Sequence, residues 1–163
     1  HNRDPRRVQV GRRRRSIGTQ RALGRRQRSA EDLDADLVAL VDRLARRLRT
    51  AHRVCRTVVL RLRFDDFSRA TRSHTLSEAT AHTQTILIVA RGLLATAMPM
   101  IRSQGITLIG VTLSNLDDDS AIQLALPFGR PLAHTLDATL DSVRDRFGRA
   151  AITPAVLLGR DRG

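Results

Sequence analysis

The sequence predicts an α+β domain of the split βαβ type: the element order βαββαβ, a four-stranded sheet, and two helices on one face. Three observations lead to this prediction. Residues 55–76 alternate in two runs around a short turn, as two paired strands do. Residues 29–48 and 80–102 repeat apolar side chains with the helical period. A last alternating run, 106–116, follows the second helix, and residues 15–19 can form a short strand before the first.

The central hairpin, 55–76, has two chemically different faces. Its first strand places four apolar side chains on one face, Val58, Leu60, Leu62 and Phe64. The opposite face receives Thr57, Val59, Arg61 and Arg63, and the second strand adds Arg69, Thr71, Ser73 and Thr75. Asp65 and Asp66 interrupt the run as turn residues. The apolar face must pack on the helices, whereas the cationic, hydroxyl-rich face without acids suits a polyanion.

Capping signals set the expected helix ends. Ser29 is the predicted N-cap of the first helix, with Asp32 completing a capping box. Its buried stripe is Leu37, Leu40, Val41, Leu44 and Leu48. Arg43, Arg46, Arg47 and Arg49 lie mostly off that stripe and are interpreted as a solvated helix back rather than a binding surface.

For the second helix we expect Thr80 as N-cap, an end near Arg102 and a stop at Gly105. Pro99 is expected to kink or loosen its last turns. The inward side chains are predicted to be Ile86, Val89, Ala90, Leu93, Ala97 and Ile101.

Composition narrows the function classes. The 163 residues carry a net charge of +13, and all 29 basic residues are arginine. Residues 1–28 alone hold eleven arginines against Asp4. Exclusive arginine usage suits bidentate phosphate contacts, but it also fits a G+C-rich genome. Four phenylalanines are the whole aromatic content, which argues against base-stacking platforms and against an RNA-binding sheet of the RRM type.

No catalytic or metal site is predicted. The five histidines are scattered without ligand spacing, and Cys55, at the start of a strand, is interpreted as a buried structural thiol rather than a nucleophile. A single cysteine cannot form an internal disulfide, which favours a reducing cytoplasm. We expect no membrane-spanning segment and no signal peptide. The first residue is not Met, as though the chain were cut from a longer protein.

The region after the sheet has three parts. The acidic residues Asp117, Asp118 and Asp119 are interpreted as a solvated linker rather than a divalent-ion site. Residues 121–128, AIQLALPF, closed by Gly129 and Pro131, are predicted to be a short linear anchor peptide. The tail contains one more amphipathic helical pattern, formed by Leu136, Leu140, Val143 and Phe147.

Five motifs carry a family resemblance. They are NRDPR at 2–6, RRSIGTQ at 14–20, TRSHTL at 71–76, LIGVTLSNL at 108–116 and QLALPF at 123–128. In this order they resemble the C-terminal part of bacterial Y-family translesion DNA polymerases, of the DNA polymerase IV type. The family usually has Glu where this chain has Gln20, and Thr-Phe where it has Ala22 and Leu23.

The resemblance implies a division into the end of a thumb domain with linker (1–11), a DNA-binding little finger domain (12–117), a linker with a clamp-binding peptide (118–130) and a partly helical tail (131–163). It implies a monomeric, cytoplasmic, nucleoid-associated module that grips primer–template phosphates without sequence preference in error-prone damage tolerance. The catalytic palm, with its Mg²⁺-binding acids, is absent from these residues, so the chain alone is not expected to polymerise and needs no cofactor. An alternative is the same region of a catalytically inactive adaptor that scaffolds repair proteins.

The resemblance also implies two sets of site residues. The expected DNA-binding residues are Arg13, Arg14, Arg15, Ser16, Ile17, Gly18, Arg56, Arg61, Arg63, Arg69, Thr71, Arg72 and Ser73. The expected residues for binding a sliding clamp are Gln123, Leu124, Leu126, Pro127 and Phe128.

Overall fold

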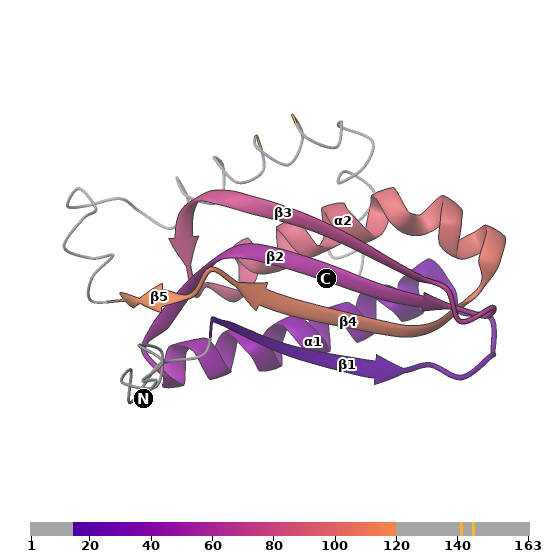
Figure 1. Ribbon diagram of the computed structural model, residues 1–163, viewed down its shortest axis with the longest axis horizontal. Helices are drawn as coiled ribbons and strands as arrows, with labels where there is room; N and C mark the ends of the chain where they lie inside the picture. The colour runs from indigo at the N-terminus through magenta and orange to yellow at the C-terminus, as the bar shows by residue number, and fades with distance from the viewer. Residues whose placement is uncertain (1–14, 120–140, 142–144, 146–163) are drawn as a thin grey trace, which may run out of the picture.

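A computed structural model describes residues 15–119 together with Asp141 and Asp145. Its elements are β1 (Ser16–Ala22), α1 (Ala30–Thr50), β2 (Arg53–Phe64), β3 (Arg69–Thr80), α2 (Thr83–Gln104), β4 (Ile106–Ser114) and β5 (Asp117–Asp118). Both helices lie on the same side of the sheet (Figure 1). The predicted α+β class and βαββαβ order are confirmed. The predicted tail helix, 136–147, lies almost wholly outside the described residues.

The sheet is antiparallel throughout, with the strand order β1-β4-β2-β3. Strand β4 lies between β1 and β2, which α1 connects, and β2 lies between β3 and β4, which α2 connects. Each helix therefore joins two parallel strands across one intervening strand, which is the split βαβ arrangement. β1 and β3 form the edges of the sheet.

A short fifth strand was not predicted. Asp117 and Asp118, interpreted above as solvated linker, pair antiparallel with Val54 and Arg53 at the start of β2. The backbone N–H of the next residue, Asp119, donates to the carbonyl of His52 at 3.0 Å. Backbone pairing needs no particular side chain, so an acidic segment extends the sheet once β4 delivers it beside β2.

The first helix begins as its capping signals predict. The Ser29 hydroxyl accepts from the Asp32 N–H at 3.1 Å, and the Asp32 carboxylate accepts from the Ser29 N–H at 3.4 Å, which closes the capping box. All five residues of the predicted stripe are buried. Helix α1 is joined to α2 by a bidentate ion pair, in which Arg91 donates from Nε and Nη2 to Asp34 at 2.8 and 2.9 Å.

The start of α2 differs from the prediction. Its N-cap is His82, not Thr80, because β3 extends to Thr80 and pairs it with Cys55. The Thr80 hydroxyl accepts from the His82 N–H at 3.1 Å, so it supports the turn into the helix without capping it. The helix ends at Gln104. Gly105 follows with φ +70°, a conformation that glycine adopts readily, and it stops the helix as predicted.

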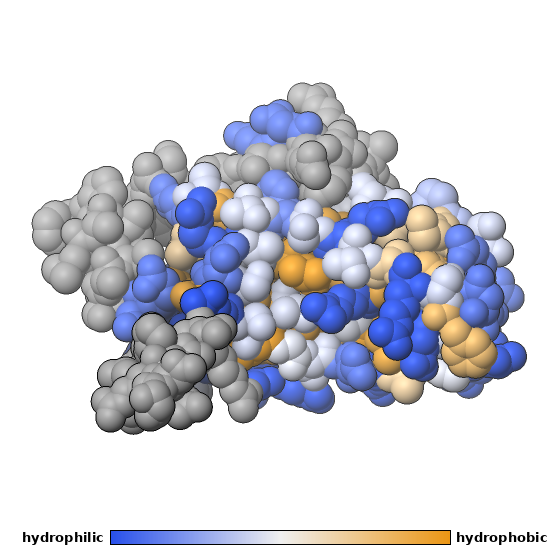
Figure 2. Space-filling model, viewed as in Figure 1, coloured by the Kyte–Doolittle hydropathy of each residue, from blue (hydrophilic) through white to orange (hydrophobic). Residues whose placement is uncertain are grey.

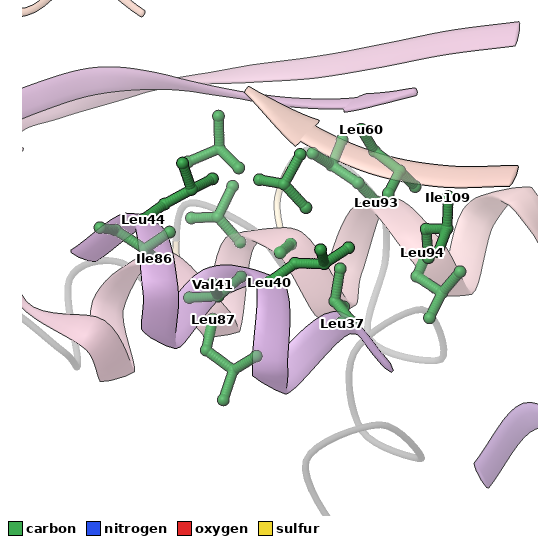
Figure 3. Packing of buried hydrophobic residues seen from close by; sticks show 14 of the residues in the cluster. Leu37, Leu40, Val41, Leu44, Leu60, Ile86, Leu87, Leu93, Leu94 and Ile109 are labelled. Carbon is green, nitrogen blue, oxygen red and sulfur yellow. The ribbon is translucent and has the colours of Figure 1, made fainter. Parts of the chain in front are cut away.

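The core fills the gap between the helices and the sheet. Side chains of α1, α2, β2 and β4 point toward one another there (Figure 3). The four apolar residues predicted for one face of β2 are all buried, as are the six predicted for α2. Contrary to the expectation from sequence, α2 is long and apolar enough by length and composition to span a membrane. Most of its apolar residues are instead buried against the sheet and α1, as in a core helix.

Candidate nucleic-acid interface

The side of the sheet that the helices leave uncovered, called the open face below, is built from every second residue of the four long strands. The registers align these residues in four cross-strand rows. In order along the sheet, the rows are Ser16, Ser114, Thr57 and Thr75; Gly18, Thr112, Val59 and Ser73; Gln20, Gly110, Arg61 and Thr71; and Ala22, Leu108, Arg63 and Arg69. Hydroxyl groups thus gather at one end and guanidinium groups at the other. Figure 2 shows this face, with pale residues and an orange patch across the middle and blue residues toward both ends, including the end where β2 and β3 join.

The hydroxyl end contains a small hydrogen-bond network. The hydroxyls of Thr57 and Thr75 lie 2.9 Å apart across the β2–β3 pair. Asn115 donates from Nδ2 to the Thr57 hydroxyl at 2.6 Å. Thr57 is buried by these contacts, whereas Thr75 remains exposed. The predicted polar alternation of both strands is therefore present. In the first row, however, part of the hydrogen-bonding capacity of the hydroxyls is used within the protein.

Glycines bring the strands close together in the middle rows. A Cβ at Gly18 would lie 2.8 Å from the Thr112 hydroxyl, closer than side chains allow. A Cβ at Gly110 would lie 3.1 Å from the Cβ of Gln20. Gly18 therefore permits a close approach, and the group approached is a side chain of the neighbouring strand. Without a side chain at Gly110, the face is also hollowed beside Arg61.

That hollow, about 180 Å³ in volume, is the most cationic part of the open face. Its lining consists of Gln20, Arg61, Leu62, Arg63, Arg69, Ala70, Thr71 and Leu108. Three of these residues are arginines and none is acidic. Arg61 and Arg69 are exposed, whereas Arg63 is half-buried and donates from Nε to the Thr107 hydroxyl at 3.2 Å. One guanidinium is thereby fixed against the sheet while two remain available at the surface.

Three predicted DNA-binding side chains do not belong to the rows of the open face. Ile17 packs against the hydrophobic core on the helix side of β1. Arg72 is the cross-strand partner of buried Leu60, so it too lies on the helix side, at the β3 edge. Arg56 sits where the β2–β3 register shifts, between Cys55 and Thr57. It is exposed, but its Nε and Nη2 donate to the Leu76 carbonyl at 3.2 and 3.0 Å.

The remaining predicted site residues lie either on the open face, just before β1, or outside the described residues. Ser16, Gly18, Thr71 and Ser73 are exposed on the open face. Arg15 is exposed just before β1. Arg13, Arg14 and the whole predicted clamp-binding set, 123–128, lie outside the described residues.

Sequence reasoning included Ser16 and Gly18 of β1 but missed Gln20 and the contribution of β4 to this surface. Gln20, Thr112 and Ser114 belong to the same rows as the hairpin residues. The alternation in 106–116 was visible, but nothing in it tells which face joins which neighbour. Two arginines of α1, interpreted as a solvated helix back, also reach the β1 edge. Arg43 donates to the Thr19 hydroxyl and Arg47 to the Gly18 carbonyl, both at 3.5 Å.

Within the described residues, no group of three or more His, Cys, Asp or Glu side chains is placed to hold a metal ion. Cys55 is buried, and burial raises the pKa of its thiol to about 12. A thiol in that state is neutral at physiological pH and is a poor nucleophile. The groups that the open face presents are guanidinium, hydroxyl and amide groups.

The fold and the open face define a class of protein, α+β modules that present an uncovered cationic sheet. Residues 14–126 match the family model described as impB/mucB/samB family C-terminal domain. The chain therefore belongs to the impB/mucB/samB family, and the resemblance drawn from its motifs is confirmed.

Relatives and solved structures agree with this family. The chain is 38% identical over 167 residues to "DNA polymerase IV 2" of Mesorhizobium japonicum, covering 93% of this chain and 40% of the relative. It is 33% identical over 119 residues to "DNA polymerase IV" of Streptococcus thermophilus, covering 73% and 32%. The chain thus spans two fifths or less of these relatives.

Two solved structures share its fold. One is the "Complex of beta-clamp processivity factor and little finger domain of PolIV", with TM-score 0.50, 21% identity, and coverage of 72% of this chain and 96% of that one. The other is the "Insertion ternary complex of Dbh DNA polymerase", with TM-score 0.56, 14% identity, and coverage of 63% and 29%. The described domain has the little finger fold.

Proposed function

We propose that the open face binds the backbone phosphates of primer–template DNA without sequence preference. The observation that carries this proposal is the hollow lined by Arg61, Arg63 and Arg69 and by no acidic residue. Guanidinium groups pair strongly with phosphate oxygens. The neighbouring serine and threonine hydroxyls add neutral donors of the kind that also contact phosphates.

The chemistry of the face favours backbone contacts over base reading. The rows contain no aromatic side chain on which a base could stack, and Gln20 is their one amide side chain. Phosphate contacts position a protein on DNA and carry little sequence information. Such a surface suits a polymerase that must accept any sequence and a distorted template. If about six phosphates are neutralised, the log–log salt slope should be near −5.

The second part of the proposal is that residues 123–128 dock on a sliding clamp. These residues, QLALPF, combine an amide with three large apolar side chains in a short linear peptide. Such peptides bind by placing a few anchors in apolar pockets. A solved structure of the same fold is titled as a complex of a clamp with a little finger domain, which supports this partner.

For the full-length parent, we propose a translesion DNA polymerase acting in the bacterial cytoplasm, at the nucleoid, in damage tolerance. The names of the relatives support this activity. The residues that hold Mg²⁺ for nucleotidyl transfer would lie in a palm outside this chain. Within it, the described domain would hold the DNA, and residues 123–128 would hold the clamp.

The experiment that tests phosphate binding removes two exposed arginines of the hollow. We would replace Arg61 and Arg69 with Ser, since neither makes a hydrogen bond or ion pair within residues 15–119, whereas Arg63 is bonded to Thr107. Titration of two duplexes of unrelated sequence should show equal losses and a salt slope shallower by about two. Arg46→Ser with Arg144→Ser removes the same charge from α1 and the tail and should change the slope less. A loss confined to one of the two duplexes would contradict backbone recognition.

A further inference from the structure

The turn between β2 and β3 carries an exposed aromatic side chain. Phe67 is 66% exposed and is the exposed large apolar residue of the described part of the chain. Its φ is +68°, a left-handed conformation that is costly for a bulky side chain. Burial does not offset this cost, since the ring remains largely in solvent. A strained conformation of a bulky residue that burial does not offset points to a function for that residue.

Hydrogen bonds hold this turn in place. The Phe67 N–H donates to the Phe64 carbonyl, and the Phe64 N–H donates to the Ser68 carbonyl, both at 2.9 Å. Asp66 accepts from the hydroxyl and the N–H of Ser68, and these bonds lower the pKa of its carboxyl. The ring of Phe67 is therefore presented by a defined turn rather than by a loose loop.

An arginine lies over the Phe67 ring. The guanidinium carbon of Arg25 is 5.7 Å from the ring centroid, within the range of a cation–π contact. Bases of single-stranded nucleic acids stack on aromatic rings and on guanidinium planes alike. Phe67 and Arg25 together thus offer a stacking surface that the open face lacks.

A cationic pocket of about 350 Å³ adjoins Arg25. Its lining consists of Arg25, Arg26, Gln27, Arg28, Asp65, Ile101, Arg102, Ser103, Gln104, Gly105 and Ile106. Arg28 is neutralised by Asp36, to which its Nη2 donates at 2.7 Å. The other three arginines still outnumber the single carboxylate, Asp65. The pocket can therefore take a phosphate group beside the stacking surface.

These groups continue the arginine end of the open face. Arg63 and Arg69, which belong to the last row of the open face, flank the turn that carries Phe67. The turn, the segment after β1 and the end of α2 lie at the same end of the domain (Figure 1). A DNA strand that leaves the open face at its arginine end would meet Phe67 and the pocket next.

We propose that Phe67, Arg25, Arg26 and Arg102, called the tip site below, bind an unpaired nucleotide of single-stranded DNA adjoining the duplex on the open face. The base stacks on Phe67 and Arg25, and a phosphate lies between Arg26 and Arg102. This proposal rests on the proposed function, because the duplex brings the unpaired strand to the tip.

The test compares a blunt duplex of about 16 base pairs with the same duplex extended by about five thymidines on either the 5′ or the 3′ strand. We expect the unaltered chain to bind one of the extended duplexes more tightly. Phe67→Asn removes the ring, and Asn tolerates the left-handed backbone. This change should weaken binding of the extended duplex about tenfold and that of the blunt duplex less than twofold. Phe67→Trp keeps an aromatic ring and should preserve the tighter binding of the extended duplex.

A change in the DNA separates the base from the phosphate. Abasic residues in the extension keep the phosphates and remove the stacking partner. Phe67→Asn should then have no further effect, whereas Arg26→Ser should still weaken binding and reduce the salt slope by about one. Arg46→Ser is the matched control, since this exposed arginine pairs with Asp42 on α1, away from the pocket lining.

The outcomes distinguish the two proposals. Failure of the unaltered chain to bind the blunt duplex contradicts the proposed function. If Phe67→Asn lowers the affinity for the blunt and the extended duplex equally, or lowers neither, the proposal of the tip site is wrong. Duplex binding by the open face is not affected by that outcome. An effect of Arg26→Ser no larger than that of Arg46→Ser overturns its phosphate contact.

Discussion

Arg63 and Arg69 lie directly opposite each other across the β2–β3 pair, both on the open face. Two like charges in that position destabilise a sheet. Arg63 is held toward Thr107 by a hydrogen bond of 3.2 Å, so the pair has limited freedom to separate. A phosphate bound between the two guanidiniums would remove the repulsion. Without DNA, the protein is therefore less stable than the same fold would be without this pair of like charges.

Replacing Arg69 with Thr should raise stability and weaken DNA binding at once. Removal of the like charge is expected to add about 0.2–1 kcal/mol at low salt, and Thr also suits a strand. Thermal melts at low and high salt check this, because the gain should shrink as salt screens the charges. The DNA salt slope should fall by about one. A lower melting temperature at low salt would mean that the pairing is not repulsive.

The arginine-rich segment before β1 is expected to contact DNA rather than to act as a spacer. Changing residues 12–15 from Arg to Ser should lower affinity by more than about twofold at moderate salt and make the salt slope shallower. Replacing Arg144, Arg146, Arg149 and Arg160 with Ser removes the same charge from the tail and serves as control. A spacer would leave the slope unchanged, and titration of a duplex at several salt concentrations distinguishes the two.

The clamp-docking peptide should depend on its two largest anchors. Burying Leu126 and Phe128 contributes on the order of 3–5 kcal/mol before ordering costs. The double change Leu126→Ala and Phe128→Ala should therefore weaken clamp binding by about a hundredfold or more. Melting temperature and DNA affinity should stay constant. If these side chains instead pack on the domain, the melting temperature would fall by several degrees. Unchanged clamp binding would show that residues 123–128 are not the docking peptide.

Stability should decline in strong alkali because of Cys55. Burial raises the pKa of this thiol from its ordinary 9.0 to about 12. Between these values the unfolded chain loses the proton and the folded chain retains it, so unfolding is favoured as pH rises. The loss should approach about 1.4 kcal/mol per pH unit within that window, and stability below pH 9 should be unaffected by this group.

The composition of the chain allows the effect of Cys55 on stability to be measured without interference from other titrating side chains. The chain contains neither lysine nor tyrosine, so no other side-chain type ordinarily titrates in the same window. Denaturant unfolding of the unaltered chain and of Cys55→Val at pH 8 and pH 10.5 checks the prediction. An equal decline in both proteins would show that the thiol is not its source.

Local signals in the sequence determined the helices and the two sides of the hairpin. Ser29 and Asp32 specify the start of α1 through bonds between residues three apart, and the stripe of α1 follows from a period of 3.6. The burial of Val58 and Leu60 follows in the same way from the period of two. Each of these features depends on neighbours in the chain, and each was predictable.

The tertiary structure decided the features that depend on which strand pairs with which. Gln20, Gly110, Arg61 and Thr71 form one row because β4 inserts between β1 and β2. Alternation tells which residues share a face of one strand, but hydrogen bonds between distant segments choose the neighbour and the register. The register shift at Arg56, the N-cap at His82 and the strand at Asp117–Asp118 have the same origin.

The sequence by itself therefore determined the α+β class, the capped first helix and the cationic character of the hairpin, because periodicity, capping and charge are local properties. Tertiary pairing alone decided that Gln20 and Leu108 join the arginines of the hairpin around one hollow and that Arg25 meets Phe67. Gln20, Arg25 and Leu108 lie tens of positions from the hairpin in the sequence, and strand order and register bring them to it.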